Sequence, residues 1–134
     1  MNALLDTHVF LWAVFAPDKL SADARSLIQD IDNALFLSTI SFWEIALKHA
    51  IGQLELNGCS PEELPAIAAS MQLELLQPAP EELASFHRLP RVAHKDPFDR
   101  LIIWQALQNR LALISKDQRL SDYAALGLKS FGEA

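Results

Sequence analysis

The sequence predicts an α/β domain built on a mainly parallel sheet of four to five strands. Short apolar runs alternate along the chain with longer segments that carry helix-start residues or helical spacing. This alternation is typical of parallel strands joined by crossover helices. About half of the 134 residues are hydrophobic, and a chain of this length can bury roughly two-thirds of its unfolded surface in one core. We therefore expect residues 1–134 to form a single domain.

The chain opens with a strand and an apolar helix. The run 2–6 (NALLD) is expected to be a buried strand, and 8–15 a helix that Thr7 caps and Pro17 ends. Because this helix is apolar almost all round, it should be either buried or covered by a partner.

Two helices and a second strand follow. Residues 21–32 predict an amphipathic helix with Ser21 as its N-cap. Its expected buried face consists of Leu27, Ile28 and Ile31. The run 35–39 predicts a strand, and 41–52 a helix that Gly52 closes.

The second half of the chain continues the alternation. Residues 60–71 begin with Ser60 and Pro61, a strong helix start, although Pro65 fits poorly beyond the first turn. The remaining elements are expected to be a strand at 73–77, a helix at 80–89, a helix from Asp96 to about 109, a strand at 111–115, a short helix near 118–126 and an edge strand near 128–131.

Composition and charge bear on the compartment and on the binding partners of the protein. The net charge is −6, which argues weakly against general nucleic-acid binding, and Cys59 is the single cysteine, so the chain has no internal disulfide. The N-terminus lacks a basic segment ahead of its apolar residues, and no apolar run approaches the roughly 20 residues that span a bilayer. We expect a cytoplasmic protein without a membrane segment.

Four acids occupy positions that would bring them to one edge of such a sheet. Asp6 ends the first strand, Glu44 lies near the start of the helix after the second strand, and Asp117 follows the fourth strand. The carboxyl ends of parallel strands and the starts of the following helices share an edge, so these three should meet there. Asp99, in the first turn of the helix before the fourth strand, joins them if that helix also starts at this edge.

Each acid also has an ordinary structural explanation. Ser41 and Glu44 have the spacing of a capping box, and Lys48 lies four residues after Glu44, which suits a helix ion pair. Asp96 is a good N-cap, with Asp99 in the third helical position. The other two acids can be simple turn residues.

The direction of two of these acids favours a site. Helical spacing from Asp99 and from Glu44 leads along apolar positions that should face the sheet, with Lys48 as the polar exception. These positions are Ile102, Ile103 and Ala106 after Asp99, and Ile40, Leu47 and Ile51 around Glu44. Trp43 and Trp104 adjoin the same faces and are expected to be core residues.

Converging carboxylates repel one another. Two unit charges roughly 4 Å apart cost about 4 kcal/mol at an effective dielectric of about 20. Protonation or a divalent cation relieves this cost. An oxygen-only cluster suits Mg²⁺, with Mn²⁺ as a substitute, better than zinc, and such ions activate water and bind phosphates. The acids therefore point to metal-dependent phosphodiester cleavage.

A family resemblance is carried, in order, by the segments LLDTHVFLW, STISFWEIALKHAIGQL, HKDPFDRLIIWQAL and LISKDQRL. Together they resemble the PIN-domain ribonucleases, specifically the VapC-type toxins of bacterial toxin–antitoxin modules. The resemblance covers nearly the whole chain and implies a three-layer α/β/α fold and Mg²⁺-dependent endonuclease action on RNA. It assigns the catalytic and metal-binding roles to Asp6, Glu44, Asp99 and Asp117. Asp96 is expected to cap its helix and support the ligands, and Thr7 to orient Asp6 or a water.

The resemblance also implies partners. VapC-type toxins are usually inhibited by a cognate antitoxin, whose C-terminal segment lies in the active-site groove, and commonly form homodimers. The apolar helix 8–15 leaves room for such a partner. Arg100, Lys48 and Lys116 lie near the acids in sequence and are candidate contacts for RNA phosphates, with ordinary solvated charge as the alternative.

Other functions remain open on the sequence alone. A phosphatase of the haloacid-dehalogenase type would use Asp6 as nucleophile, but it needs a second acid where this chain has His8. A receiver-like signalling module needs adjacent acids at the first strand, where this chain has one. A PIN-like scaffold that binds RNA without cutting it is the third alternative.

Overall fold

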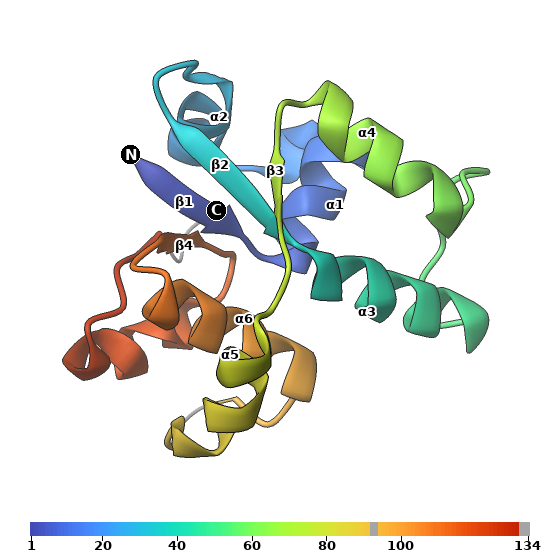
Figure 1. The fold of residues 1–134 in the computed structure, drawn as a ribbon. Helices are drawn as coiled ribbons and strands as arrows, with labels where there is room; N and C mark the ends of the chain where they lie inside the picture. Colours follow the sequence, from blue (N-terminus) through green and yellow to red (C-terminus); the bar gives the residue numbers. More distant parts are fainter. Residues whose placement is uncertain (92–93, 132–134) are drawn as a thin grey trace.

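The computed structural model describes residues 1–91 and 94–131, and it contains a parallel sheet with helices on both faces (Figure 1). The strands are β1 (Asn2–Leu5), β2 (Ala34–Ser38), β3 (Glu74–Leu76), β4 (Ala112–Ile114) and β5 (Ser130–Phe131), in the order β3-β2-β1-β4-β5. Leu5, the last residue of β1, is in register with Leu37 of β2 and Ile114 of β4. The carboxyl ends of three adjacent strands therefore lie side by side at one edge of the sheet, as predicted for the strands that precede the acids. The expected three-layer α/β/α architecture is confirmed.

Alternate residues of the strands supply two separate cores. Ala3 and Leu5 of β1 face the layer formed by α1 (Thr7–Phe15), α2 (Ala22–Gln29), α3 (Thr39–Ala50) and α4 (Leu64–Ser70). Leu4 faces the opposite layer, formed by α5 (Pro80–Ser85), α6 (Pro97–Gln108) and the 3₁₀ helix η4 (Gln118–Leu126). Short 3₁₀ turns complete the chain at η1 (Pro17–Lys19), η2 (Pro61–Glu63) and η3 (Phe86–Arg88).

The helix starts differ from expectation in two places. Asp6, not Thr7, caps α1, and Ser38, the last residue of β2, caps α3. As a result α3 begins at Thr39, so Ser41 and Glu44 already lie inside the helix and do not form a capping box. Ser21 is the N-cap of α2, as predicted.

Two helices are shorter than expected. The segment 60–71 divides into η2 and α4, which places Pro65 in the first turn of α4, where a proline loses no helical hydrogen bond. Helix α2 ends at Gln29, so Ile31 falls outside it and is 90% exposed, contrary to its predicted burial.

The predicted buried face of α6 is confirmed, whereas that predicted around Glu44 is wrong for Leu47 and Ile51, and Ile40 is half-buried. Ile102, Ile103 and Ala106 are fully buried beneath the sheet. Leu47 and Ile51 are exposed because α3 extends outward beyond the end of β2 (Figure 1).

The two tryptophans also differ. Trp43 is 60% exposed, whereas Trp104 packs against the second core and its indole N–H donates to the carbonyl of Glu82 at 3.0 Å. Trp43 is therefore a surface residue and the prediction of burial was wrong for it.

Helix α1 is neither wholly buried nor free. Val9 and Phe10 are fully buried, and the following residues to Phe15 are partly buried against the first core. None of the helices in the described parts of the chain is long and apolar enough to cross a membrane.

Candidate active site

Asp6 lies where β1 turns into α1. Its Oδ1 accepts a hydrogen bond from the backbone N–H of Val9 at 2.8 Å, and its Oδ2 accepts the hydroxyl hydrogen of Ser115, the residue that follows β4. Burial nevertheless raises the pKa of Asp6 to about 6, and the nearby Glu44 carboxylate adds to that rise. In the absence of a cation, Asp6 therefore takes up a proton at a higher pH than an ordinary aspartate does.

Glu44 is a buried carboxylate whose two oxygens have different partners. It is 2% exposed. Its Oε1 accepts a hydrogen bond from the hydroxyl of Thr7 at 2.7 Å, and Oγ of Ser41 lies 2.9 Å from that same hydroxyl. Its Oε2 lies 2.5 Å from the ammonium nitrogen of Lys48, one helical turn away. The predicted i,i+4 ion pair is thus present, and Thr7 orients Glu44 instead of Asp6.

Helix α6 begins with two further acids at the same edge. Asp96 caps the helix, because its Oδ1 accepts a hydrogen bond from the N–H of Phe98 at 2.8 Å. Asp99 is half-buried in the first turn. Burial, and then the charges of Asp96, Glu44 and Asp6, raise the pKa of Asp99 to about 6. The condition for Asp99 to join the other acids is therefore met.

Three of these carboxylates form a tight group. The ligand oxygens of Glu44, Asp96 and Asp99 lie within 4.8 Å of one another. We call these three residues the acidic cluster. Asp6 is close enough to raise the pKa of Asp99, but it is held by Ser115 at the side of the cluster.

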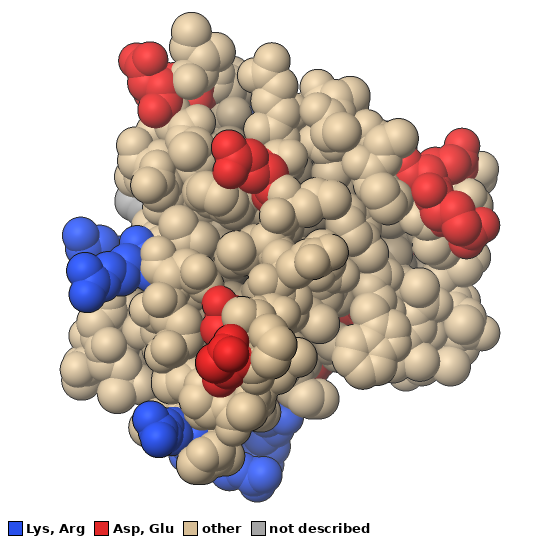
Figure 2. Space-filling model, in the orientation of Figure 1, with Lys and Arg blue, Asp and Glu red and all other residues tan. Residues whose placement is uncertain are grey.

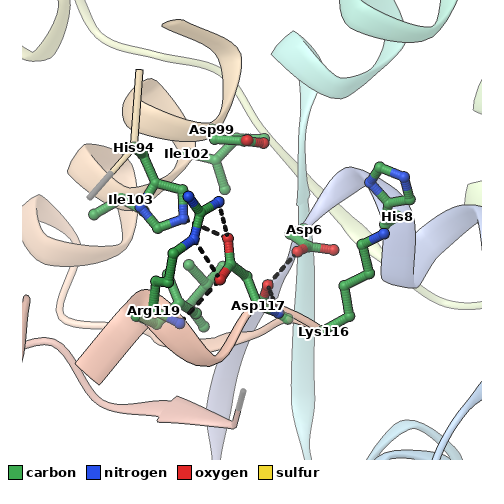
Figure 3. A pocket seen from close by; sticks show the side chains of 12 residues that line it. Asp6, His8, His94, Asp99, Ile102, Ile103, Lys116, Asp117 and Arg119 are labelled. Atoms are coloured by element: carbon green, nitrogen blue, oxygen red, sulfur yellow. Dashed lines mark hydrogen bonds and ion pairs between the residues drawn. The ribbon is translucent and has the colours of Figure 1, made fainter. Parts of the chain in front are cut away.

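Asp117 lies in a different environment, paired with two cationic or titratable groups (Figure 3). Arg119 donates to its Oδ1 from Nε at 3.1 Å and to its Oδ2 from Nη2 at 2.9 Å, while Nε2 of His94 lies 2.7 Å from Oδ2. The Arg119 bonds, assisted by His94, hold the pKa of Asp117 well below its usual range. Buried His94 is fixed in turn by the hydroxyl of Tyr123, 3.1 Å from its Nδ1.

The acids open onto two adjoining pockets. Figure 3 shows Asp6, Asp99 and Asp117 lining one pocket, and Glu44 lines the second with Thr7 and Lys48. His8 lines both pockets and so marks the boundary between them. The structure therefore brings all four predicted acids to one edge, but the closest group contains only Glu44 and Asp99 of the four, together with Asp96, and leaves Asp6 and Asp117 outside it.

The three basic residues expected to contact RNA have different surroundings. Lys116 is exposed beside Trp12, with its ammonium 5.5 Å from the ring centre, and Lys48 lies inside the site. Arg100 is buried and donates to the carbonyls of Leu89 at 3.0 Å and Pro90 at 3.2 Å. Arg100 therefore fastens a loop to α6 and is unsuited to contact RNA.

Two residues that hold the site together, Ser115 and His94, were not predicted from the sequence. Ser115 bridges two acids, because its hydroxyl donates to Asp6 and accepts the backbone N–H of Asp117 at 3.0 Å. Its position could have been found from the parallel register, which continues from Leu5 and Ile114 to Asp6 and Ser115. His94 gave no such signal, because its contact with Asp117 spans 23 residues and depends on a loop.

The donor set fits a hard divalent cation. Every ligand atom in the acidic cluster is a carboxylate oxygen, the kind that Mg²⁺ and Mn²⁺ prefer. Burial, and then the charges of neighbouring carboxylates, raise the pKa values of Asp6 and Asp99, so the protein alone does not fully stabilise their ionised forms. A bound cation would stabilise the ionised forms.

Comparison with known proteins agrees with this architecture. The PIN domain family model matches residues 3–126. Ribonuclease VapC22 of Mycobacterium tuberculosis is 30% identical over 126 residues, which are 91% of this chain and 92% of that protein.

Solved structures show the same fold at lower identity. VapBC2 from Rickettsia felis, bound to a DNA fragment from its promoter, matches with a TM-score of 0.67 and 15% identity, covering 98% of both chains. FitAcB from Neisseria gonorrhoeae matches with a TM-score of 0.63 and 23% identity, covering 98% of this chain and 96% of that one. From the family match and the 30% identity, the chain belongs to the PIN-domain family, as a VapC-type member.

Proposed function

We propose that this protein is a Mg²⁺-dependent endoribonuclease and the toxin of a bacterial toxin–antitoxin module, acting in the cytoplasm as one nuclease domain. The observation that carries the proposal is the acidic cluster, three carboxylates whose ligand oxygens lie within 4.8 Å, with Asp6 beside it. The family membership and the similarity to a protein named ribonuclease VapC22 support the choice of RNA as substrate.

The acids would have different roles in metal binding, according to where they lie in the site. Glu44 and Asp99 hold the ion together with Asp6, directly or through water. Asp96 caps α6 with Oδ1 and supports the cluster with Oδ2. Asp117, committed to Arg119 and His94, supports a water molecule or a second ion from the edge of the site. When bound, Mg²⁺ would activate water for attack on phosphorus and stabilise the charge that develops on the phosphate.

Exposed cations next to the pocket would position the RNA. Lys116 and Arg119 line the pocket beside the acids, and the Arg119 side chain is 61% exposed. Such groups can bind phosphates although the net charge of the chain is −6. No observation favours the phosphatase or the receiver function over this assignment.

We also propose two protein partners, following the VapC-type resemblance. An antitoxin segment would enter the active-site groove, and the likeness to complexes named VapBC2 and FitAcB supports this partner.

The second partner is another copy of this chain. An apolar groove between α3, α5 and α6 would receive it, and this face carries few charges between α3 and α5 (Figure 2). The groove is lined by Ile40, Trp43, Leu83, Phe86, Pro97, Phe98 and Leu101.

The experiment is RNA cleavage by the purified protein with Mg²⁺ and with EDTA. Wild type should cut RNA only with Mg²⁺, and Asp99→Asn should lose most of this activity. Asp18→Asn, which removes an exposed acid in η1, is the matched control and should cut as wild type does. Full cleavage by Asp99→Asn, or cleavage in EDTA, would exclude the proposed mechanism.

A further inference from the structure

Lys48 places a positive charge inside the acidic cluster. Its ammonium nitrogen lies 2.5 Å from Oε2 of Glu44 and 3.8 Å from Oδ2 of Asp96. These are two of the three carboxylates whose oxygens lie within 4.8 Å of one another. A single charge of the protein itself thus lies among the oxygens that a divalent ion would need.

The two partners of this ion pair differ in their freedom. The Lys48 side chain is 28% exposed, so its end can move toward solvent, whereas Glu44 is buried and fixed through Oε1 by Thr7. Oε2 is therefore the Glu44 oxygen that remains for an ion, and Lys48 holds that oxygen. An ion that binds Glu44 through Oε2 must take the place of the ammonium group.

We propose that Lys48 is an internal counter-cation, which stabilises the acidic cluster in the metal-free protein and competes with the divalent ion for Oε2 of Glu44. This inference rests on the metal-dependent function proposed above. Removal of the ammonium group should have two opposite effects. The metal-free protein loses a compensating charge and becomes less stable, while the ion binds more tightly because it no longer displaces a competitor. Lys48 thereby sets the metal concentration at which the site fills.

The test measures Mn²⁺ binding to the full chain by calorimetry, without RNA, together with the melting temperature in EDTA. Lys48→Met should bind Mn²⁺ about tenfold more tightly than wild type, the scale set by loss of a hydrogen bond to a charged group. It should also melt at a lower temperature in EDTA. Lys48→Arg, which keeps the charge, should stay close to wild type in both measurements.

Lys116→Met is the matched control for charge. It removes a cation that also acts on Asp6, but in the described parts of the chain no carboxylate pairs with Lys116. Equal tightening in Lys116→Met and Lys48→Met would overturn the inference, because the effect would then be general electrostatics. So would unchanged affinity in Lys48→Met.

The outcomes separate this inference from the proposed function. If wild type binds Mn²⁺, Asp99→Asn binds it weakly and Lys48→Met binds it no more tightly than wild type, the metal site stands and the role of Lys48 fails. If wild type and Lys48→Met both fail to bind Mn²⁺, the metal-dependent function and the inference fail together.

Discussion

The hydroxyl of Thr7 donates to Oε1 of Glu44 at 2.7 Å and thereby joins the first turn of α1 to α3. Because the Thr7 hydrogen points to Glu44, the hydroxyl of Ser41 must donate to Thr7 across the 2.9 Å between their oxygens. Two buried hydroxyl groups therefore orient one buried carboxylate. This arrangement fixes which oxygen of Glu44 is left for a cation.

Thr7→Val should destabilise the protein by roughly 1–3 kcal/mol, because it keeps the side-chain shape but leaves a buried carboxylate oxygen and a buried hydroxyl without their partner. Urea unfolding in EDTA measures the change. Thr7→Ser keeps the hydroxyl and should lose much less. Equal losses in the two variants would mean that the methyl group, not the hydrogen bond, stabilises this position.

Asp99 should make the metal-free protein less stable as the pH rises. Its pKa is raised from 3.8 to about 6, so between these values the folded state binds more protons than the unfolded state, and the free energy of unfolding falls with increasing pH. Asn at position 99 does not titrate. In EDTA, the free energy of unfolding of Asp99→Asn minus that of wild type should therefore increase from pH 4 to pH 7.

Groups that titrate in both proteins contribute equally to the pH dependence of wild type and of Asp99→Asn, so their contributions cancel in the difference. His8, whose pKa is lowered by burial, acts in the opposite direction, and Asp6 acts in the same direction as Asp99. Urea unfolding at several pH values gives the difference. A difference that stays constant from pH 4 to pH 7 would contradict the raised pKa of Asp99. Saturating Mn²⁺ should reverse the order at pH 7, because the ion favours the ionised carboxylate of the wild type.

Asp117→Asn should weaken Mn²⁺ binding much less than Asp99→Asn does. The Asp117 carboxylate already pairs with Arg119 and contacts His94, whereas in the described parts of the chain no cation forms an ion pair with Asp99, whose pKa is raised. Calorimetric Mn²⁺ titration of both variants decides this. Equal losses would show that Asp117 is a ligand of the same ion and would require it to leave Arg119.

The fold class could be predicted from the alternation of strands and helices. The meeting of the acids could be predicted because the carboxyl ends of parallel strands share one edge of the sheet. Asp6 directly follows β1 and Asp117 lies three residues after the end of β4, so the register of β1 and β4 brings them to the same edge. Boundaries were harder, because β2 and α3 abut without a loop and Ser38 serves as both strand end and N-cap. Ser41 then appeared to be an equally good helix start.

Contacts between distant helices could not be predicted from spacing. The 3.8 Å approach of Lys48 to Asp96 depends on how α3 and α6 lie against each other. The burial of Arg100 depends on the path of residues 89–90, whose carbonyls it binds. Local sequence shows the charge of these residues but not the neighbours that the tertiary fold provides.

Trp43→Ser should convert a dimer into a monomer if the apolar groove receives a second copy. Trp43 is 60% exposed, and its ring packs edge-to-face against Phe98 with centroids 5.1 Å apart, so it presents a large apolar surface at little cost to the core. Aromatic residues of this kind supply much of the binding energy of protein interfaces. Light scattering after gel filtration gives the mass. Ile31→Ser removes an even more exposed apolar side chain outside the groove, and it should leave the dimer intact. If wild type is a monomer, the proposed homodimer is excluded. If Trp43→Ser keeps the mass of a dimer, the dimer contact lies outside this groove.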